Sequence, residues 1–184
     1  MIRIEPDWKK LSDIRVVSFD VDGVLTDGGL YVGENGEMFK KFNAKDGVAV
    51  SLLKNYGLKV GLVSGKKSKG LDFRINELRF DYAITDCRDK LSAVETLLDR
   101  IELKFSQVAF VGDDVLDVPV MKKTGLSIAP ADGHPLAKQM AHIVTLAKGG
   151  EGVARESAEY ILKESGITLE MMYADLMASG DFTQ

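Results

Sequence analysis

Two aspartates one residue apart, Asp20 and Asp22, directly follow a short β-branched and aromatic run at positions 16–19. Such a run predicts a strand buried on both faces, and the carboxyl end of a strand is where an open α/β sheet keeps its reactive groups. Alternate side chains of an extended backbone point to opposite sides, so both acids share a site only if the chain turns at once, which Gly23 permits. One carboxylate can then attack while the other handles a proton. The alternative is a solvated turn, since Asp and Gly are common in turns.

Three further groups of polar residues also lie in loop segments at the carboxyl ends of predicted strands. They are Ser64 with Gly65, Lys90, and the acids Asp113, Asp114 and Asp117. The carboxyl ends of parallel strands meet at one edge of a sheet, so we expect these groups to converge with Asp20 and Asp22. Each group also has a plainer interpretation. Ser64-Gly65 is typical of a strand-to-helix turn, Lys90 of an exposed first helical turn, and Asp113-Asp114 of a helix cap.

Crowded carboxylates repel one another, so a site built from these residues should hold a hard cation. Oxygen ligands suit Mg²⁺, and no His/Cys set has the spacing of a zinc site. Beside Mg²⁺, Asp20 can form an aspartyl-phosphate, while Ser64 and Lys90 stabilise the phosphoryl oxygens. Asp22 can protonate the departing alkoxide and later accept a proton from water. The sequence therefore indicates phosphoryl transfer.

Apolar strands alternate with amphipathic helices along the chain, which predicts a doubly wound α/β fold with a mostly parallel sheet. We expect one domain over residues 1–165, with a β-hairpin at about 29–42 and a C-terminal tail at 166–184. The predicted strands are 15–19, 58–63, 82–85, 108–111, 125–129 and 142–145. The predicted helices are 48–56, 67–79, 89–101, 118–123, 135–140 and 151–164. The tail either packs one helical face of Leu169, Met172, Tyr173 and Leu176 or frays.

The composition of the 184-residue chain, 45% hydrophobic and 28% charged, is ordinary for a soluble globular protein. A net charge of -4 without a Lys/Arg cluster argues against nucleic-acid and membrane partners. The single cysteine, Cys87, cannot form an internal disulfide and suits a reducing cytoplasm. Residues 1–13 lack the apolar core of a leader, and no run approaches membrane-spanning length. We expect a cytoplasmic protein.

Residues 20–28 (DVDGVLTDG), Ser64-Gly65, Lys90 and residues 112–117 (GDDVLD) resemble the four ordered motifs of the haloacid dehalogenase superfamily of phosphatases. Residues 43–47, 132–135 and 149–156 resemble, more closely, the 3-deoxy-D-manno-octulosonate 8-phosphate phosphatase family within it. This resemblance implies hydrolysis of that sugar-acid phosphate to 3-deoxy-D-manno-octulosonate (KDO) and phosphate, a step of lipopolysaccharide biosynthesis. A looser reading keeps the chemistry and changes the substrate to a nonulosonate 9-phosphate.

The resemblance also implies a role for each matched residue. Asp20 would be the nucleophile and a Mg²⁺ ligand, Asp22 the acid/base and a ligand through its carbonyl, and Asp113 the third ligand. Ser64 and Lys90 would hold the phosphoryl group, with Asp114 and Asp117 orienting the groups around the metal. The expected substrate-binding residues are Thr26, Asp46, Gly47, Gly65, Lys66, Arg74 and Arg155.

The spacing leaves no room for a cap domain, because only the hairpin and one helix fit between Asp22 and Ser64. A phosphoryl-transfer site works better with bulk water restricted. The hairpin carries more apolar residues than a free ribbon keeps in water: Leu30, Tyr31, Val32, Met38, Phe39 and Phe42. We expect hairpins of several copies to pair, with neighbours as the lid, in agreement with the tetramers of the resembled family.

Two functions of a different class use the same fold. The chain could be a non-catalytic assembly domain, against which the intact Asp20, Asp22, Lys90 and Asp113 speak. It could also be a receiver-type phosphoacceptor, which likewise places Mg²⁺ and an aspartate at a strand end. A receiver has no need of an acid at Asp22, whereas the protonation of a sugar alkoxide does.

Overall fold

The computed structural model describes residues 13–34 and 36–179. Its main sheet is parallel, with the strand order β5-β4-β1-β6-β7-β8. The bounds are β1 Val16–Phe19, β4 Lys59–Val63, β5 Tyr82–Ile84, β6 Val108–Val111, β7 Leu126–Ala129 and β8 Ile143–Val144. The predicted doubly wound α/β fold is confirmed. The expectation about a leader concerns residues 1–13, of which 1–12 lie outside the described residues, as does the tail end at 180–184.

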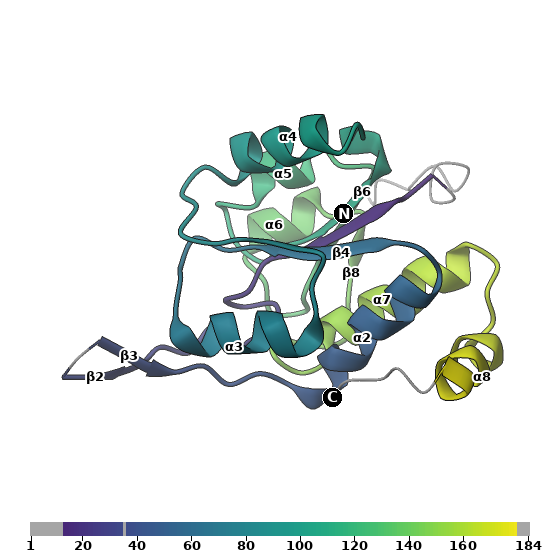
Figure 1. Ribbon diagram of the computed structural model, residues 1–184. Coiled ribbons are helices and arrows are strands. Elements are labelled where there is room, and N and C mark those ends of the chain that lie inside the picture. The colour runs from purple at the N-terminus through teal and green to yellow at the C-terminus, as the bar shows by residue number, and fades with distance from the viewer. Residues whose placement is uncertain (1–12, 35, 180–184) are drawn as a thin grey trace.

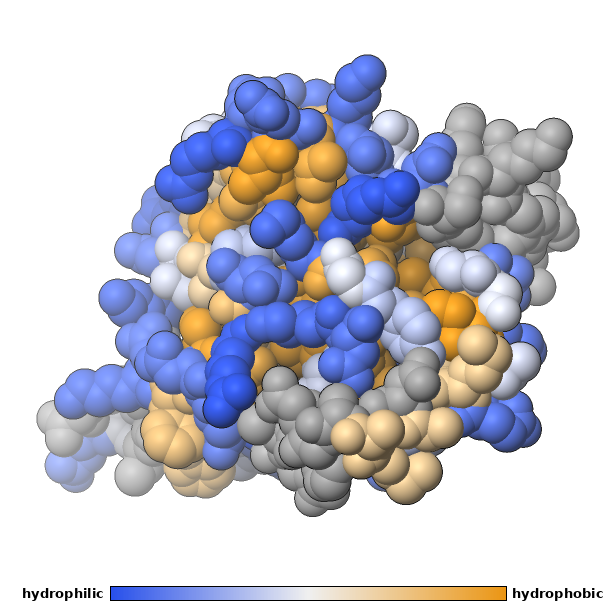
Figure 2. Space-filling view, turned by 45° about the vertical axis from the view of Figure 1, so that its right-hand side comes forward, coloured by the Kyte–Doolittle hydropathy of each residue, from blue (hydrophilic) through white to orange (hydrophobic). Residues whose placement is uncertain are grey.

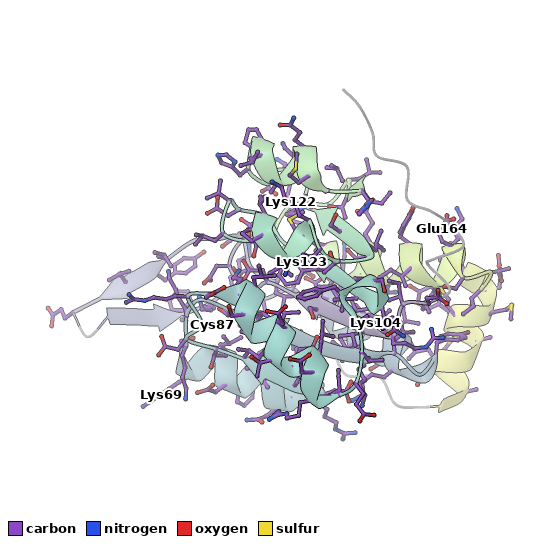
Figure 3. The ribbon with its side chains drawn as sticks, turned by 90° about the horizontal axis from the view of Figure 1, so that it is seen from above. Lys69, Cys87, Lys104, Lys122, Lys123 and Glu164 are labelled. Atoms are coloured by element: carbon purple, nitrogen blue, oxygen red, sulfur yellow. The ribbon has the colours of Figure 1, made fainter. Side chains whose placement is uncertain are left out.

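Strand β1 lies between β4 and β6, and all four of its residues are buried. Phe19 pairs with Leu62 of β4 and with Val111 of β6, so the three strands end nearly level. The residues that follow these three strands therefore lie at the same edge of the sheet. Figure 3 shows this direction: Cys87, which follows β5, lies toward the hairpin, and Lys104, which precedes β6, lies toward the opposite end.

Helices cover both faces of the sheet (Figure 1). One face of the sheet packs against α2, α3, α7 and α8 and the other against α4, α5 and α6, and β1, β4 and β6 contribute buried side chains to both faces. The bounds are α2 Ala44–Asn55, α3 Lys69–Leu78, α4 Lys90–Arg100, α5 Val118–Met121, α6 Pro135–Met140, α7 Val153–Glu164 and α8 Leu169–Ser179, with a 3₁₀ turn η1 at Phe105–Gln107. None of the described helices is long and apolar enough to cross a bilayer.

The hairpin consists of β2 Tyr31–Gly33 and β3 Gly36–Phe39 and projects from the body of the molecule (Figure 1). Phe42, which falls within the predicted hairpin range, lies beyond β3 and forms an isolated bridge with Thr26 in the turn after β1. Tyr31 and Phe39 stack with ring centroids 4.5 Å apart. Leu30, Val32 and Phe39 remain exposed in the single chain.

The tail forms helix α8, which packs on its own domain. Met172 and Leu176 are buried against the core that contains α2 and α7. Leu169, expected on the same face, is exposed, because it is the first residue of the helix, next to the turn that leaves α7. Figure 2 shows apolar colour gathering over α8, where Met171 and Met177 lie exposed.

The docking of α8 can be tested with two methionines that are adjacent in sequence. Met172 is fully buried and Met171 is half exposed. Met172→Ala should lower the free energy of unfolding by about 2–5 kcal/mol, because it leaves a cavity in the core. Met171→Ala should change it by about 0.5 kcal/mol or less. Chemical denaturation measures both values, and equal effects of the two substitutions would contradict this packing.

Candidate active site

Lys90 lies between two carboxylates at the carboxyl edge of the sheet. Its Nζ is 2.8 Å from Oδ1 of Asp20 and 2.6 Å from Oδ1 of Asp117. All three side chains are buried. Lys90 begins α4, where Asp89 caps the helix by accepting the Ser92 backbone N–H. A first-turn lysine normally reaches solvent; this one turns inward, because two buried aspartates require a cation.

Asp117 uses both of its carboxylate oxygens to hold the site together. Oδ1 accepts from Lys90, and Oδ2 accepts the backbone N–H groups of Asp113 and Asp114 at 3.0 and 3.2 Å. A Cβ at Gly112 would lie 2.6 Å from the Cβ of Asp117, so only glycine fits there. This arrangement supports the predicted role of Asp117 in orienting Lys90 and the loop with Asp113.

Asp113 has a carboxylate oxygen that the described residues leave without a partner. Its Oδ1 is buried and accepts no hydrogen bond from them. Its carboxylate lies over Gly23, where φ is +87° and an added Cβ would overlap it. Ligand oxygens of Asp20, Asp113 and Asp117 lie within 4.8 Å of one another. Because Asp117 is already fully hydrogen-bonded, Asp20 and Asp113 are the better side-chain ligands, and the all-oxygen set fits Mg²⁺.

The crowding of these carboxylates raises the pKa values of two of them. Burial and the Asp117 charge raise the pKa of Asp20 to about 6, although Lys90 opposes this. Burial and the charges of Asp20 and Asp117 raise the pKa of Asp113 to about 8. Burial lowers the pKa of Lys90, but the two neighbouring carboxylates outweigh it and the net direction is upward. One ammonium thus faces three acids, and a divalent cation would balance the remaining charge.

The two other predicted catalytic residues lie on the neighbouring loops. Ser64 is buried at the end of β4; its backbone N–H donates to Ile84 of β5 and its Oγ accepts the Lys66 N–H at 3.2 Å. Asp22 lies in the turn after β1, where its Oδ1 forms an ion pair with Nζ of Lys40. Sequence reasoning missed Lys40, because a lysine next to an apolar hairpin carries no spacing signal.

The glycine-rich segment 149–152 packs against the turn that follows Asp22. Gly150 N–H donates to the Val24 carbonyl at 3.0 Å, and a Cβ at Gly150 would lie 2.6 Å from the Asp27 nitrogen. A Cβ at Gly149 would overlap the Gly23 carbonyl. This segment therefore braces the catalytic turn.

Two predicted substrate-binding residues make contacts inside the fold. The Thr26 hydroxyl donates to the Val21 carbonyl at 3.3 Å and accepts the Gly28 N–H. Asp46 is buried, and its Oδ1 accepts the backbone N–H groups of Ala154 and Arg155 at the start of α7. Asp46 thereby caps a helix whose own N-cap, Gly152, has no side chain to do so.

The predicted arginines differ in where their guanidinium groups lie. Arg74 donates to the Asn43 carbonyl at 3.3 Å, pairs with Glu77 and lines a hollow of about 460 Å³ beside the hairpin. Arg155 is bound by Glu159 at 2.7 Å and by the Tyr173 hydroxyl at 2.6 Å, so it is held toward α8.

The remaining predicted site residues differ in their exposure to solvent. Gly65 and Lys66 are exposed immediately after Ser64, and Gly47 is buried within α2. Asp114 is exposed and accepts the Val115 N–H at 2.7 Å. Gly65 and Lys66 therefore lie at the predicted edge and open to solvent, while Gly47 serves helix packing.

Asp46 predicts a measurable dependence of stability on pH. Burial raises its pKa to about 6, despite the two N–H groups of α7 that it accepts. The native state therefore binds the extra proton more readily than the unfolded state, and this group makes stability fall as pH rises from about 4 to 6. Asp46→Asn keeps the acceptor but cannot titrate.

The difference in unfolding free energy between Asp46→Asn and wild type should shift in favour of the variant across that window, by up to about 3 kcal/mol. Urea denaturation at several pH values measures it. Asp99→Asn, at an exposed position of α4, is the control and should show no such trend. Parallel curves for wild type and Asp46→Asn would contradict the assignment.

The comparisons with known proteins agree with this geometry. Residues 84–156 match the model of the haloacid dehalogenase-like hydrolases. A 3-deoxy-D-manno-octulosonate 8-phosphate phosphatase of Yersinia pestis is 41% identical over 154 residues, 84% of this chain and 82% of the relative.

Two solved structures have folds similar to that of this chain. The crystal structure of the Yersinia pestis phosphatase aligns with a TM-score of 0.83 and 36% identity, covering 96% of this chain and 89% of the other. The Moraxella catarrhalis phosphatase, solved with magnesium ion, phosphate ion and KDO, aligns with a TM-score of 0.82 and 30% identity over 85% and 90% of the two chains. With its carboxylates and lysine gathered at the same sheet edge, this chain belongs to the 3-deoxy-D-manno-octulosonate 8-phosphate phosphatase family of the haloacid dehalogenase-like hydrolases.

Proposed function

We propose that this protein is a Mg²⁺-dependent phosphatase that hydrolyses 3-deoxy-D-manno-octulosonate 8-phosphate to KDO and phosphate. The observation that carries the proposal is the buried cluster of Asp20, Lys90, Asp113 and Asp117. The relatives supply the substrate: one bears that name at 41% identity, and another was solved with magnesium, phosphate and KDO. The cation would be held by Asp20, Asp113 and the Asp22 carbonyl.

The reaction proceeds in two steps. A carboxylate oxygen of Asp20 attacks phosphorus, the bond from phosphorus to the sugar oxygen breaks, and Asp22 gives that oxygen a proton. Water then attacks the aspartyl-phosphate, Asp22 takes a proton from the water, and Asp20 and phosphate are released. Lys90 and Ser64 stabilise the phosphoryl oxygens throughout. Bound Mg²⁺ supplies further positive charge for those oxygens.

The sugar acid is recognised by basic groups around the same edge. Lys66 is exposed beside Ser64, and Arg74 lines the hollow beside the hairpin. Gly65 allows close approach of the phosphate to the backbone. Thr26 and Asp46 act on the substrate through the turn after β1 and the start of α7, which their hydrogen bonds stabilise, and Gly47 lies next to Asp46 in α2. Arg155 reaches a sugar acid only after it leaves Tyr173 and Glu159.

A panel of phosphate esters tests this activity. Purified protein with Mg²⁺ should release phosphate from the octulosonate 8-phosphate faster than from a nonulosonate 9-phosphate or glucose 6-phosphate. Asp20→Asn should lower kcat by about 10⁴-fold or more, because the nucleophile is lost. Asp99→Asn should leave kcat unchanged. A preference for the 9-phosphate would contradict the proposed substrate. Undiminished turnover by Asp20→Asn would contradict the covalent mechanism.

The protein acts as a homotetramer in the cytoplasm, within lipopolysaccharide biosynthesis. The exposed apolar residues of the hairpin, Leu30, Val32 and Phe39, support assembly, because a free ribbon does not keep such a surface in water. In the described residues, only the hairpin and α2 lie between β1 and β4, so neighbours must restrict water at the site. The single cysteine suits the cytoplasm.

Light scattering tests the assembly. Wild type at micromolar concentration should have four times the chain mass, and Val32→Lys should reduce this mass, because it places a charge in the apolar contact. Leu146→Lys adds the same charge at an exposed leucine outside the hairpin and should leave the mass unchanged. A monomeric wild type, or a Val32→Lys protein that stays tetrameric, would contradict the hairpin contact.

A further inference from the structure

We propose that Lys40 is a positioning residue for Asp22, so that the base of the hairpin fixes the carboxylate that transfers the proton. The inference rests on the proposed function, because it assigns a partner to the acid/base of that reaction. The observation behind it is a contact across 18 residues of chain: Lys40 Nζ donates to Oδ1 of Asp22.

The burial of this pair separates it from the surface ion pairs of the molecule. The Lys40 side chain is 1% exposed and that of Asp22 is 25% exposed. The next residue, Lys41, pairs with Asp27 at 3.3 Å, but these side chains are 61% and 31% exposed. An exposed pair contributes little and holds its members loosely, whereas a buried lysine that loses its partner is strongly disfavoured. Lys40 is therefore committed to its position.

Asp22 needs such a partner because it does not belong to a strand. The chain leaves β1 at Phe19 and turns at Gly23, so Asp22 stands on a loop with a rotatable side chain. The contact with Lys40 occupies Oδ1 and leaves Oδ2 for the proton that the leaving oxygen takes. Proton transfer demands a donor within hydrogen-bond reach, so orientation of this carboxylate contributes directly to the rate.

The stem of Lys40 ties this contact to the hairpin. Lys40 directly follows β3 and lines the hollow of about 460 Å³ together with Phe39, Phe42 and Phe73. Aromatic neighbours leave a long aliphatic stem few conformations, while its ammonium reaches the polar end of the site. The hairpin thus contributes a side chain to the catalytic turn as well as an apolar surface.

A comparison of two leaving groups distinguishes the positioning of an acid from a general structural effect. A sugar alkoxide needs a proton as it departs, whereas 4-nitrophenolate departs readily without one. Lys40→Met should lower kcat/KM for the octulosonate 8-phosphate by about 10- to 100-fold, a part of what a general acid contributes. It should change kcat/KM for 4-nitrophenyl phosphate by less than about 3-fold, because kcat/KM reports the steps up to the aspartyl-phosphate and excludes the later step in which Asp22 acts as base.

Three further variants make the comparison decisive. Asp22→Asn should show the same pattern with a larger loss, and Lys40→Arg should recover part of the rate, because it keeps a donor. Lys41→Met, the matched control on the same segment, should leave both substrates unaffected. Thermal unfolding should show that each variant is folded at the temperature of the assay.

Three results would overturn the proposal: equal losses on both substrates, no loss on either, or a Lys41→Met effect as large as that of Lys40→Met. Failure of the proposed function looks different. If the wild type cleaves simple alkyl phosphates but not the octulosonate ester, the proposed substrate is wrong. The role of Lys40 is then tested by comparing alkyl with aryl phosphate esters. A wild type that cleaves no phosphate ester overturns both.

Discussion

The structure depends on a buried balance of charge at the carboxyl edge of the sheet. Lys90 bridges Asp20 and Asp117, and Asp117 in turn accepts the backbone N–H groups of the loop that carries Asp113. Removal of one partner would leave buried charge without compensation, which costs several kcal/mol. Even with Lys90 in place, the pKa of Asp113 is raised to about 8. The fold therefore maintains an excess of buried negative charge that a bound divalent cation would balance.

The fold supports this edge through close backbone packing behind it. Glycines admit the contacts: Gly23 lies under Asp113, Gly112 beside Asp117, and Gly150 against the turn after β1. Asp46 joins the start of α2 to the start of α7, and α7 follows the same glycine-rich segment. The catalytic turn is thus held from two sides by elements more than 80 residues away in sequence. This rigidity suits phosphoryl transfer, in which positioning supplies much of the rate.

Sequence patterns predicted the elements well, because burial imposes a local signature. The apolar run at 16–19 became the central strand, and the helix predicted at 48–56 is α2, which is followed by Gly57 with φ of +77°. The convergence of Asp20, Lys90 and Asp113 followed from the rule for parallel sheets alone. Lys90 was indistinguishable from an exposed lysine in its own helix, and only the convergence argument placed it in the site. Individual side-chain contacts could not be predicted: the pair of Lys40 and Asp22, the cap that Asp46 provides for α7 and the contacts of Arg155 with Glu159 and Tyr173 depend on side-chain geometry.

The proposed reaction requires that Asp20 accepts a phosphoryl group beside a cation held at this edge. A crystal structure with Mg²⁺ and beryllium fluoride, a mimic of the phosphoryl group on a carboxylate, tests this most directly. We expect beryllium bonded to Asp20, its fluorides contacting Lys90 and Ser64, and Mg²⁺ bound by Asp20, Asp113 and the Asp22 carbonyl. Beryllium fluoride on another residue, or Mg²⁺ bound away from Asp113, would contradict it.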